Sequence, residues 1–302
     1  MATVGLCLPQ LGPAVDAGLV RDFAQTAEGM GFDHLWVQDH FLYALTQEGE
    51  YGGSAAAQPE RYKSVWGPTE LLAAVAAWTS TIKLGTSVLV GGNHYPVQLA
   101  QRLATVDQLA GGRLDVIGLS VGWSVEEHRA MGVDPATRGK RMDDFVPALR
   151  ACWGPDPVSH SGPFFDLAPC LMQPKPLSGF RLMSGMWSGP GLARTAAAFD
   201  LWNPGSLPIP TVLQMLATIN EQRAPGHPPV GVLYRVALES TAGKRMTVEE
   251  VAERTAEVRG AGMEGVIIET NFVSEIDSPR AWLAVLESLK PALEAAAGRS
   301  GD

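Results

Sequence analysis

The feature of this chain that most constrains its fold is a regular alternation of short β-rich runs with helical stretches from one end to the other. Runs rich in apolar and β-branched residues read as strands over 3–8, 34–38, 82–90, 114–119, 180–185, 200–202, 230–238 and 265–269. Strands that alternate with helices form a parallel sheet, and eight such repeats close into a barrel. The rival, an open doubly wound sheet, usually has about five to seven strands. We therefore predict an α/β fold, a single (β/α)8 TIM barrel over residues 1–302.

The intervening stretches have helical periodicity and recognisable ends. We expect helices over 19–30, 70–78, 96–109, 125–131, 142–152, 192–198, 212–222, 248–260 and 279–296. Pro291 predicts a kink in the last of these helices. Two segments fall outside the alternation, 41–64 after the second strand and 154–177, and we interpret both as loop insertions. The first follows the carboxyl end of a strand, where barrels build their active sites, so it predicts a lid.

Charge and cysteine content exclude several classes of protein. The chain of 302 residues has a formal net charge of −9. Because nucleic-acid binding needs clustered Lys and Arg, we expect no nucleic-acid partner. Its three cysteines form no C-x-x-C pair, which is typical of the reducing cytosol. Because neither a signal peptide nor an apolar run of about 18 residues is present, we expect a cytoplasmic protein with no membrane partner. Its expected partner is a small-molecule substrate; a homodimer is the candidate assembly, and the sequence does not fix the oligomeric state.

Asp39 and His40 stand directly after the second strand, at the catalytic rim of the predicted barrel. Histidine is the side chain best suited to exchange protons near neutral pH, and a neighbouring carboxylate can fix its tautomer. The alternative is structural, with Asp39 capping a loop and His40 a satisfied polar residue. His94, before Tyr95 and Pro96, could face the same rim or merely begin a helix.

Small residues at the ends of the third and fourth strands leave two interpretations open. Gly85 could let the backbone approach a flat ligand, or simply relieve crowding inside the barrel. The string GLSVG (118–122) matches the nucleophile elbow of hydrolases, which would make Ser120 a nucleophile. That role needs an acid and then a histidine just after later strands, and the later histidines do not stand there. For Glu126 and Glu127, which open the next helix, stabilisation of the helix dipole is favoured over catalysis.

The loop SGMWSGPG (184–191) follows a strand and opens a helix, with Arg194 one turn into it. Backbone N–H groups at such a place form an anion site, and barrels often bind phosphate there. A plain glycine-rich connection is the alternative. No metal-ligand spacing such as H-x-x-x-H occurs. A phosphate cradle and one proton-handling histidine without a metal are what a redox-cofactor enzyme needs.

Several motifs, in order, resemble the luciferase-like monooxygenase family, whose fold is the same barrel. They are GFDHLWVQDHF (31–41), IKLGTSVLV (82–90), the long string 93–123 that ends in VGW, EEHRAMG (126–132), TRGKRMDD (137–144) and QPKP (173–176). The resemblance covers most of the chain as far as Pro204 and weakens beyond it. It also accounts for GLSVG without a nucleophile, since family members have a similar turn.

The resemblance implies a site for FMN or the deazaflavin coenzyme F420. Asp39 would approach the cofactor, and His40 would be the proton donor or acceptor. Ser87 and Val88 would form a non-prolyl cis peptide behind the ring system, which Val121 and Gly122 would line. The phosphate end would lie on the loop that contains the five residues Gly185, Trp187, Ser188, Pro190 and Gly191.

Two departures from the family's sugar-phosphate dehydrogenases bear on the substrate. Trp123 stands where those enzymes have a glutamate, and their tryptophan shortly after Asp-His is unmatched, Tyr43 being the nearest bulky aromatic. A substrate of the glucose 6-phosphate type is therefore not expected. We predict F420-dependent hydride transfer to or from a small organic molecule, because DH together with VGW resembles that branch. An FMN-dependent monooxygenase and a non-catalytic flavin-binding barrel are the alternatives.

Overall fold

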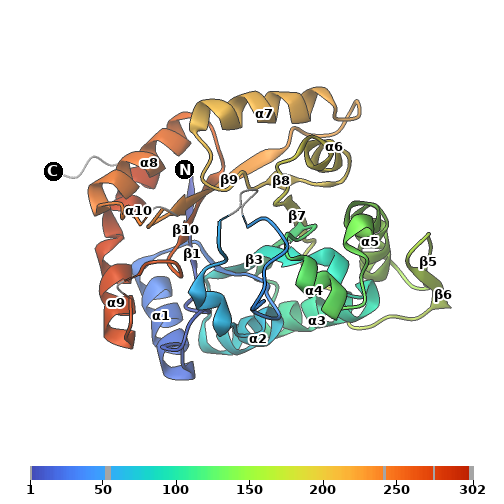
Figure 1. Cartoon of the computed structure of the whole chain (residues 1–302), viewed down its shortest axis with the longest axis horizontal. Coiled ribbons are helices and arrows are strands. Elements are labelled where there is room, and N and C mark those ends of the chain that lie inside the picture. Colours follow the sequence, from blue (N-terminus) through green and yellow to red (C-terminus); the bar gives the residue numbers. More distant parts are fainter. Residues whose placement is uncertain (1, 52–55, 241–242, 275, 299–302) are drawn as a thin grey trace.

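The computed structural model describes residues 2–51, 56–240, 243–274 and 276–298, and its centre is a closed barrel (Figure 1). The strands follow the order β1-β10-β9-β8-β7-β4-β3-β2, every neighbouring pair is parallel, and β1 closes the ring between β2 and β10. Their bounds are β1 (Thr3–Cys7), β2 (His34–Val37), β3 (Lys83–Val90), β4 (Leu114–Ser120), β7 (Arg181–Ser184), β8 (Leu201–Trp202), β9 (Gly231–Ala237) and β10 (Gly265–Glu269). All eight predicted strands are barrel strands, so the predicted fold class is confirmed.

Helices surround the barrel (Figure 1). Their bounds are α1 (Ala17–Met30), α2 (Pro68–Trp78), α3 (Pro96–Leu109), α4 (Val125–Ala130), α5 (Arg138–Trp153), α6 (Gly189–Ala198), α7 (Ile209–Glu221), α8 (Val248–Gly260), α9 (Pro279–Ser288) and α10 (Lys290–Ala297). The predicted C-terminal helix is thus two helices, and the predicted kink is a full break. Pro291 is the second residue of α10, where its missing N–H costs nothing, but its ring prevents an unbroken helix.

The insertion at 154–177 contains an antiparallel hairpin of β5 (Val158–Ser161) and β6 (Asp166–Cys170), which the sequence did not predict. Figure 1 shows this hairpin projecting from the side of the barrel beside α5. Asp144 on α5 holds it, accepting hydrogen bonds from the backbone N–H groups of Phe164 (2.8 Å) and Phe165 (2.9 Å) and pairing with His160 (2.8 Å). Both strands are short and largely exposed, so they lack the apolar alternation that reveals a strand.

The barrel lumen is filled by its own cluster of side chains. Seven strands each contribute one residue to it: Cys7, Trp36, Val116, Met183, Leu201, Leu233 and Ile267. Glycines make room for the largest member, because a Cβ at Gly85 would lie 2.4 Å from the ring of Trp36. The crowding interpretation of Gly85 is therefore the one the structure bears out, and a ligand site must lie above this plug.

A larger apolar core lies between the strands and the surrounding helices. No helix within the described ranges is long and apolar enough to cross a membrane. The short 3-10 helices η1 (Glu60–Lys63), η2 (Gly91–Asn93) and η3 (Pro135–Thr137) lie in the connections.

Candidate active site

His40 lies just beyond the carboxyl end of β2, and its ring is held by Glu127 from the first turn of α4. The distance from His40 Nδ1 to Glu127 Oε1 is 2.6 Å, and the Glu127 side chain is only 2% exposed. The same carboxylate oxygen accepts the backbone N–H of Phe41 at 2.9 Å. Ser124 caps α4 and accepts the backbone N–H of Glu127, which fixes where α4 begins. The carboxylate that orients His40 is thus Glu127. The sequence favoured a different role for Glu127, the stabilisation of the helix dipole.

Asp39 does not pair with His40, contrary to the expectation that this neighbour steers the tautomer. Its Oδ2 lies 2.7 Å from His94 Nε2 and accepts the backbone N–H of Val90 at 3.1 Å. The two side chains of the pair therefore diverge, Asp39 to the residues after β3 and His40 to α4. Asp39 Oδ1 is buried and has no hydrogen-bond partner among the described residues. Such an orphaned carboxylate oxygen is a place for a donor group of a ligand.

The peptide bond between Ser87 and Val88 is cis, as the resemblance implies. Arg235 from β9 donates to Ser87 twice, to the carbonyl oxygen and to Oγ at 2.6 Å. Arg235 also pairs with Glu269 at the end of β10. Asn203 Nδ2 adds a hydrogen bond of 3.3 Å to Ser87 Oγ. Arg235 of β9 and Asn203, which follows β8, therefore hold this peptide of β3, and Glu269 of β10 in turn holds Arg235.

The sequence analysis did not predict Arg235 or Glu269 as site residues, although charged residues in apolar strands are a recognisable signal. Arg235 stands inside the otherwise apolar strand GVLYRVA, and Glu269 ends the strand GVIIE, which is buried throughout. A charge in a buried strand is costly unless it is paired, so two such residues in neighbouring strands indicate an ion pair.

Gly122 follows β4 with a φ of +78°, which favours glycine, and a Cβ there would lie 2.6 Å from Val90 Cγ1. Val121 beside it is partly buried. Gly185 faces the same region, since its Cβ would lie 3.0 Å from Val88 Cγ1. These close approaches bring Gly122 and Gly185 against the β3 residues Val88 and Val90, and a contact with a ring system stays a prediction.

The hydrolase interpretation finds no support within the described part of the chain. Ser120 Oγ donates to the carbonyl oxygen of Gly185 at 3.2 Å rather than to a histidine. His128 Nδ1 lies 2.6 Å from Asn93 Oδ1. Burial, and then the positive charge of Arg138, lower the pKa of His128, which favours a neutral ring.

The predicted phosphate loop opens α6 as expected. Ser188 is the N-cap, and its Oγ accepts the N–H of Gly191; Pro190 is the second residue of the helix. Trp187 is 43% exposed, and its Nε1 donates to the carbonyl oxygen of Asn203 at 3.0 Å. Arg194 pairs with Asp143 at 2.6 and 3.0 Å, Pro190 has no N–H, and the N–H groups of Gly191 and Leu192 are bonded to Ser188, so anion binding on this loop stays a prediction.

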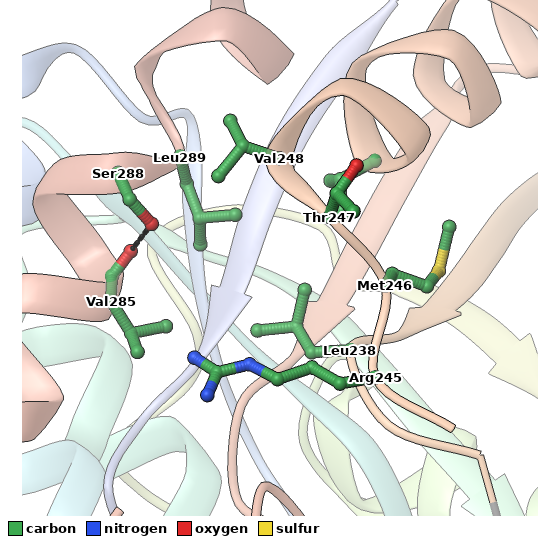
Figure 2. Close-up of a pocket in the computed structure, with 9 residues that line it drawn as sticks. Leu238, Arg245, Met246, Thr247, Val248, Val285, Ser288 and Leu289 are labelled. Carbon is green, nitrogen blue, oxygen red and sulfur yellow. Dashed lines mark hydrogen bonds between the residues drawn. The ribbon is translucent and has the colours of Figure 1, made fainter.

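A cavity of about 340 Å³ lies elsewhere, between the end of β9, the start of α8 and the end of α9. Figure 2 shows Leu238, Val248 and Leu289 around it, with the side chain of Arg245 extending along it. None of its lining residues belongs to the site around His40. The described residues also contain no group of three or more His, Cys, Asp or Glu that could hold a metal ion.

The chain belongs to the luciferase-like monooxygenase family, whose model matches residues 3–260. It is similar to the F420-dependent glucose-6-phosphate dehydrogenase of Kineococcus radiotolerans, with 32% identity over 59% of this chain and 49% of that protein. It is also similar to the FMNH2-dependent dimethylsulfone monooxygenase of Pseudomonas fluorescens, with 31% identity over 60% of this chain and 46% of that protein. The chain thus spans about half the length of these curated relatives.

Among solved structures, the fold resembles an F420-dependent secondary alcohol dehydrogenase in complex with an F420–acetone adduct, with a TM-score of 0.74. The likeness covers 96% of this chain and 99% of that one, at 15% identity, and so concerns the fold alone. Relatives of both cofactor types occur, which supports a flavin-type cofactor without distinguishing F420 from FMN.

Proposed function

We propose that the protein is an oxidoreductase that binds coenzyme F420 at the mouth of the barrel and acts on a small organic substrate. The observation that carries this proposal is the buried hydrogen bond of 2.6 Å between His40 and Glu127 at the rim. It is the arrangement of an oriented general base rather than of a packing residue. Burying a carboxylate costs free energy, and a non-catalytic barrel gains no function from one that pairs with a single histidine at the rim.

Hydride transfer to or from a carbon that carries oxygen requires that a proton move as well. When bound, F420 would supply the hydride chemistry. His40 would donate the proton when hydride goes to the substrate and accept it when hydride leaves the substrate. With Nδ1–H donated to Glu127, Nε2 is the atom of the His40 ring that can take or give that proton, and no described residue is bonded to it. Glu127 stabilises the charged ring and fixes the tautomer.

Several features of the site suit a tricyclic cofactor with a phosphate tail. The unpartnered Oδ1 of Asp39 can accept a hydrogen bond from the cofactor. Gly122 and Gly185 let the turns after β4 and β7 pack closely against Val90 and Val88, beside the place proposed for the ring. The phosphate tail is expected on the loop 185–191, which opens α6, as the resemblance implies.

The test is a fluorescence titration of the protein with F420 and with FMN side by side. We expect F420 to bind at least about tenfold more tightly, or roughly 1.4 kcal/mol. Equal or tighter binding of FMN would make the protein an FMN-dependent monooxygenase, which oxygen consumption with reduced FMN would verify. Binding of either cofactor without turnover of any substrate would leave the non-catalytic barrel.

A further inference from the structure

We infer that the substrate of this enzyme is an uncharged molecule with an aryl or other flat apolar group, bound by aromatic side chains around His40. The inference rests on the proposed function, because it names the substrate class of the same site. The side chains are Tyr51, Tyr62, Trp123 and Phe272, and we call them the aromatic wall.

The aromatic wall begins on both sides of the proposed proton carrier. The ring centroid of Tyr62 lies 4.0 Å from that of His40, and the centroid of Trp123 lies 5.5 Å from it. Tyr51 packs edge-on against both of these rings, at 6.0 Å from Tyr62 and 5.3 Å from Trp123. Phe272 continues the wall at 5.5 Å from Tyr62. A molecule that reaches His40 Nε2 therefore meets aromatic rings.

The wall is assembled from segments that are distant in the sequence. Tyr51 and Tyr62 come from the insertion after β2, Trp123 follows β4, and Phe272 follows β10. Tyr62 is buried, whereas the other three rings are only half-buried. These three keep aromatic surface that an apolar ligand can cover, and such coverage contributes favourable free energy of binding.

The charges near the wall disfavour an anionic substrate. Asp39, Glu127 and Glu269 are each at most 3% exposed, and the guanidinium of Arg235 pairs with Glu269. Arg235 is committed to Glu269 and Ser87, so it offers no phosphate or carboxylate a free partner. Glu127 and Asp39 pair with His40 and His94, and Arg61 donates to the carbonyl oxygens of Val273 and Ile276. Among these residues no cationic side chain is left without a partner, so a substrate anion would be desolvated without compensation.

The phenols add no charge to this balance. Burial raises the pKa of Tyr51 and, more strongly, that of Tyr62, and the carboxylate of Glu269 raises both further. Both hydroxyls therefore stay protonated near neutral pH. The substrate that fits is a neutral ring compound with one hydroxyl or carbonyl oxygen for His40 to exchange a proton with.

The test is direct binding, measured by titration calorimetry with four ligands built on one phenyl ring. They are acetophenone, benzoate, phenyl phosphate and phenyltrimethylammonium, each tested with and without F420. We expect acetophenone to bind at least about tenfold more tightly than each of the charged ligands. The variant Trp123→Ala should weaken acetophenone binding by about tenfold through lost aromatic contact. The control is Trp78→Ala, another half-buried tryptophan at the end of α2, on the opposite end of the barrel.

The outcomes separate this inference from the function beneath it. Equal or tighter binding of a charged ligand, no binding of acetophenone up to its solubility limit, or an unchanged affinity in Trp123→Ala would each overturn the inference. If acetophenone binds as expected but F420 neither binds nor supports turnover, the proposed function fails while the substrate class stands. If F420 binds and phenyl phosphate binds best, the function stands and the inference fails.

Discussion

The substitution Glu127→Gln removes one charge from the position that orients His40 and changes almost nothing else. The carboxylate is 2% exposed, and its Oε1 accepts from His40 Nδ1 and from the backbone N–H groups of Phe41 and Leu42. A glutamine has the same shape, and its amide oxygen can still accept the two backbone groups. The fold around the rim should therefore survive while the interaction with His40 weakens.

The size of the effect follows from the kind of hydrogen bond that is lost. A hydrogen bond to a charged group is worth about 1.5–3 kcal/mol, and a neutral one about 0.5–1.5 kcal/mol. The difference of about 1–2 kcal/mol should appear in the step in which His40 carries the proton, which is about 5- to 30-fold in rate. The affinity for cofactor should change little, because Glu127 is expected to contact His40 and not the cofactor.

The assay is pre-steady-state hydride transfer, followed by the absorbance of the cofactor, with cofactor titrations and melting curves in parallel. Glu126→Gln is the matched control, since Glu126 stands in the same first turn of α4 but bonds to Glu48 and Ser124 instead. We expect this control to transfer hydride at the wild-type rate.

A double-mutant cycle with His40→Ala distinguishes positioning from a merely structural role. If Glu127 acts through His40, Glu127→Gln should slow wild type but should not slow the His40→Ala background further. An equal loss of rate in both backgrounds would refute the reasoning. So would a drop in melting temperature with an unchanged rate per folded molecule.

Three further results are expected. His40→Ala should lower the hydride-transfer rate by about 10²–10⁴-fold with little change in cofactor affinity; an unchanged rate would pass the role to another rim residue. Arg235→Met leaves the carboxylate of Glu269 buried and unpaired, so urea unfolding should report a loss of about 3 kcal/mol, and no loss would mean that the pair is dispensable. Although burial opposes its ionisation, Glu28 on α1 accepts the backbone N–H groups of residues 80–82, which lower its pKa to about 2. Its ionised form therefore stabilises the fold above the ordinary carboxyl pKa, and this contribution disappears as the pH falls through 2. Glu28→Gln should cost about 1 kcal/mol at pH 7, after allowance for screening by solvent, and nearly nothing at pH 2; a pH-independent cost would contradict this assignment.

The fold could be predicted because its information is local. Each strand of the barrel is an apolar run of a few residues, and each helix has its own period and ends, so the positions of all eight barrel strands follow from short windows of sequence. The position of His40 directly after β2 is equally local. The β5–β6 hairpin was missed because two short exposed strands have no apolar face to reveal them.

The partners in the site are decided by tertiary structure alone. His40 meets Glu127 across 87 positions of the chain, and Asp39 meets His94 across 55, whereas the adjacent Asp39 and His40 do not pair. Ser87 and Arg235 are 148 positions apart. Closure of the barrel brings the carboxyl ends of all strands to one rim, and the register of each strand decides which side chains meet there. Periodicity within one segment contains no information about that register, because it depends on how distant segments pack together.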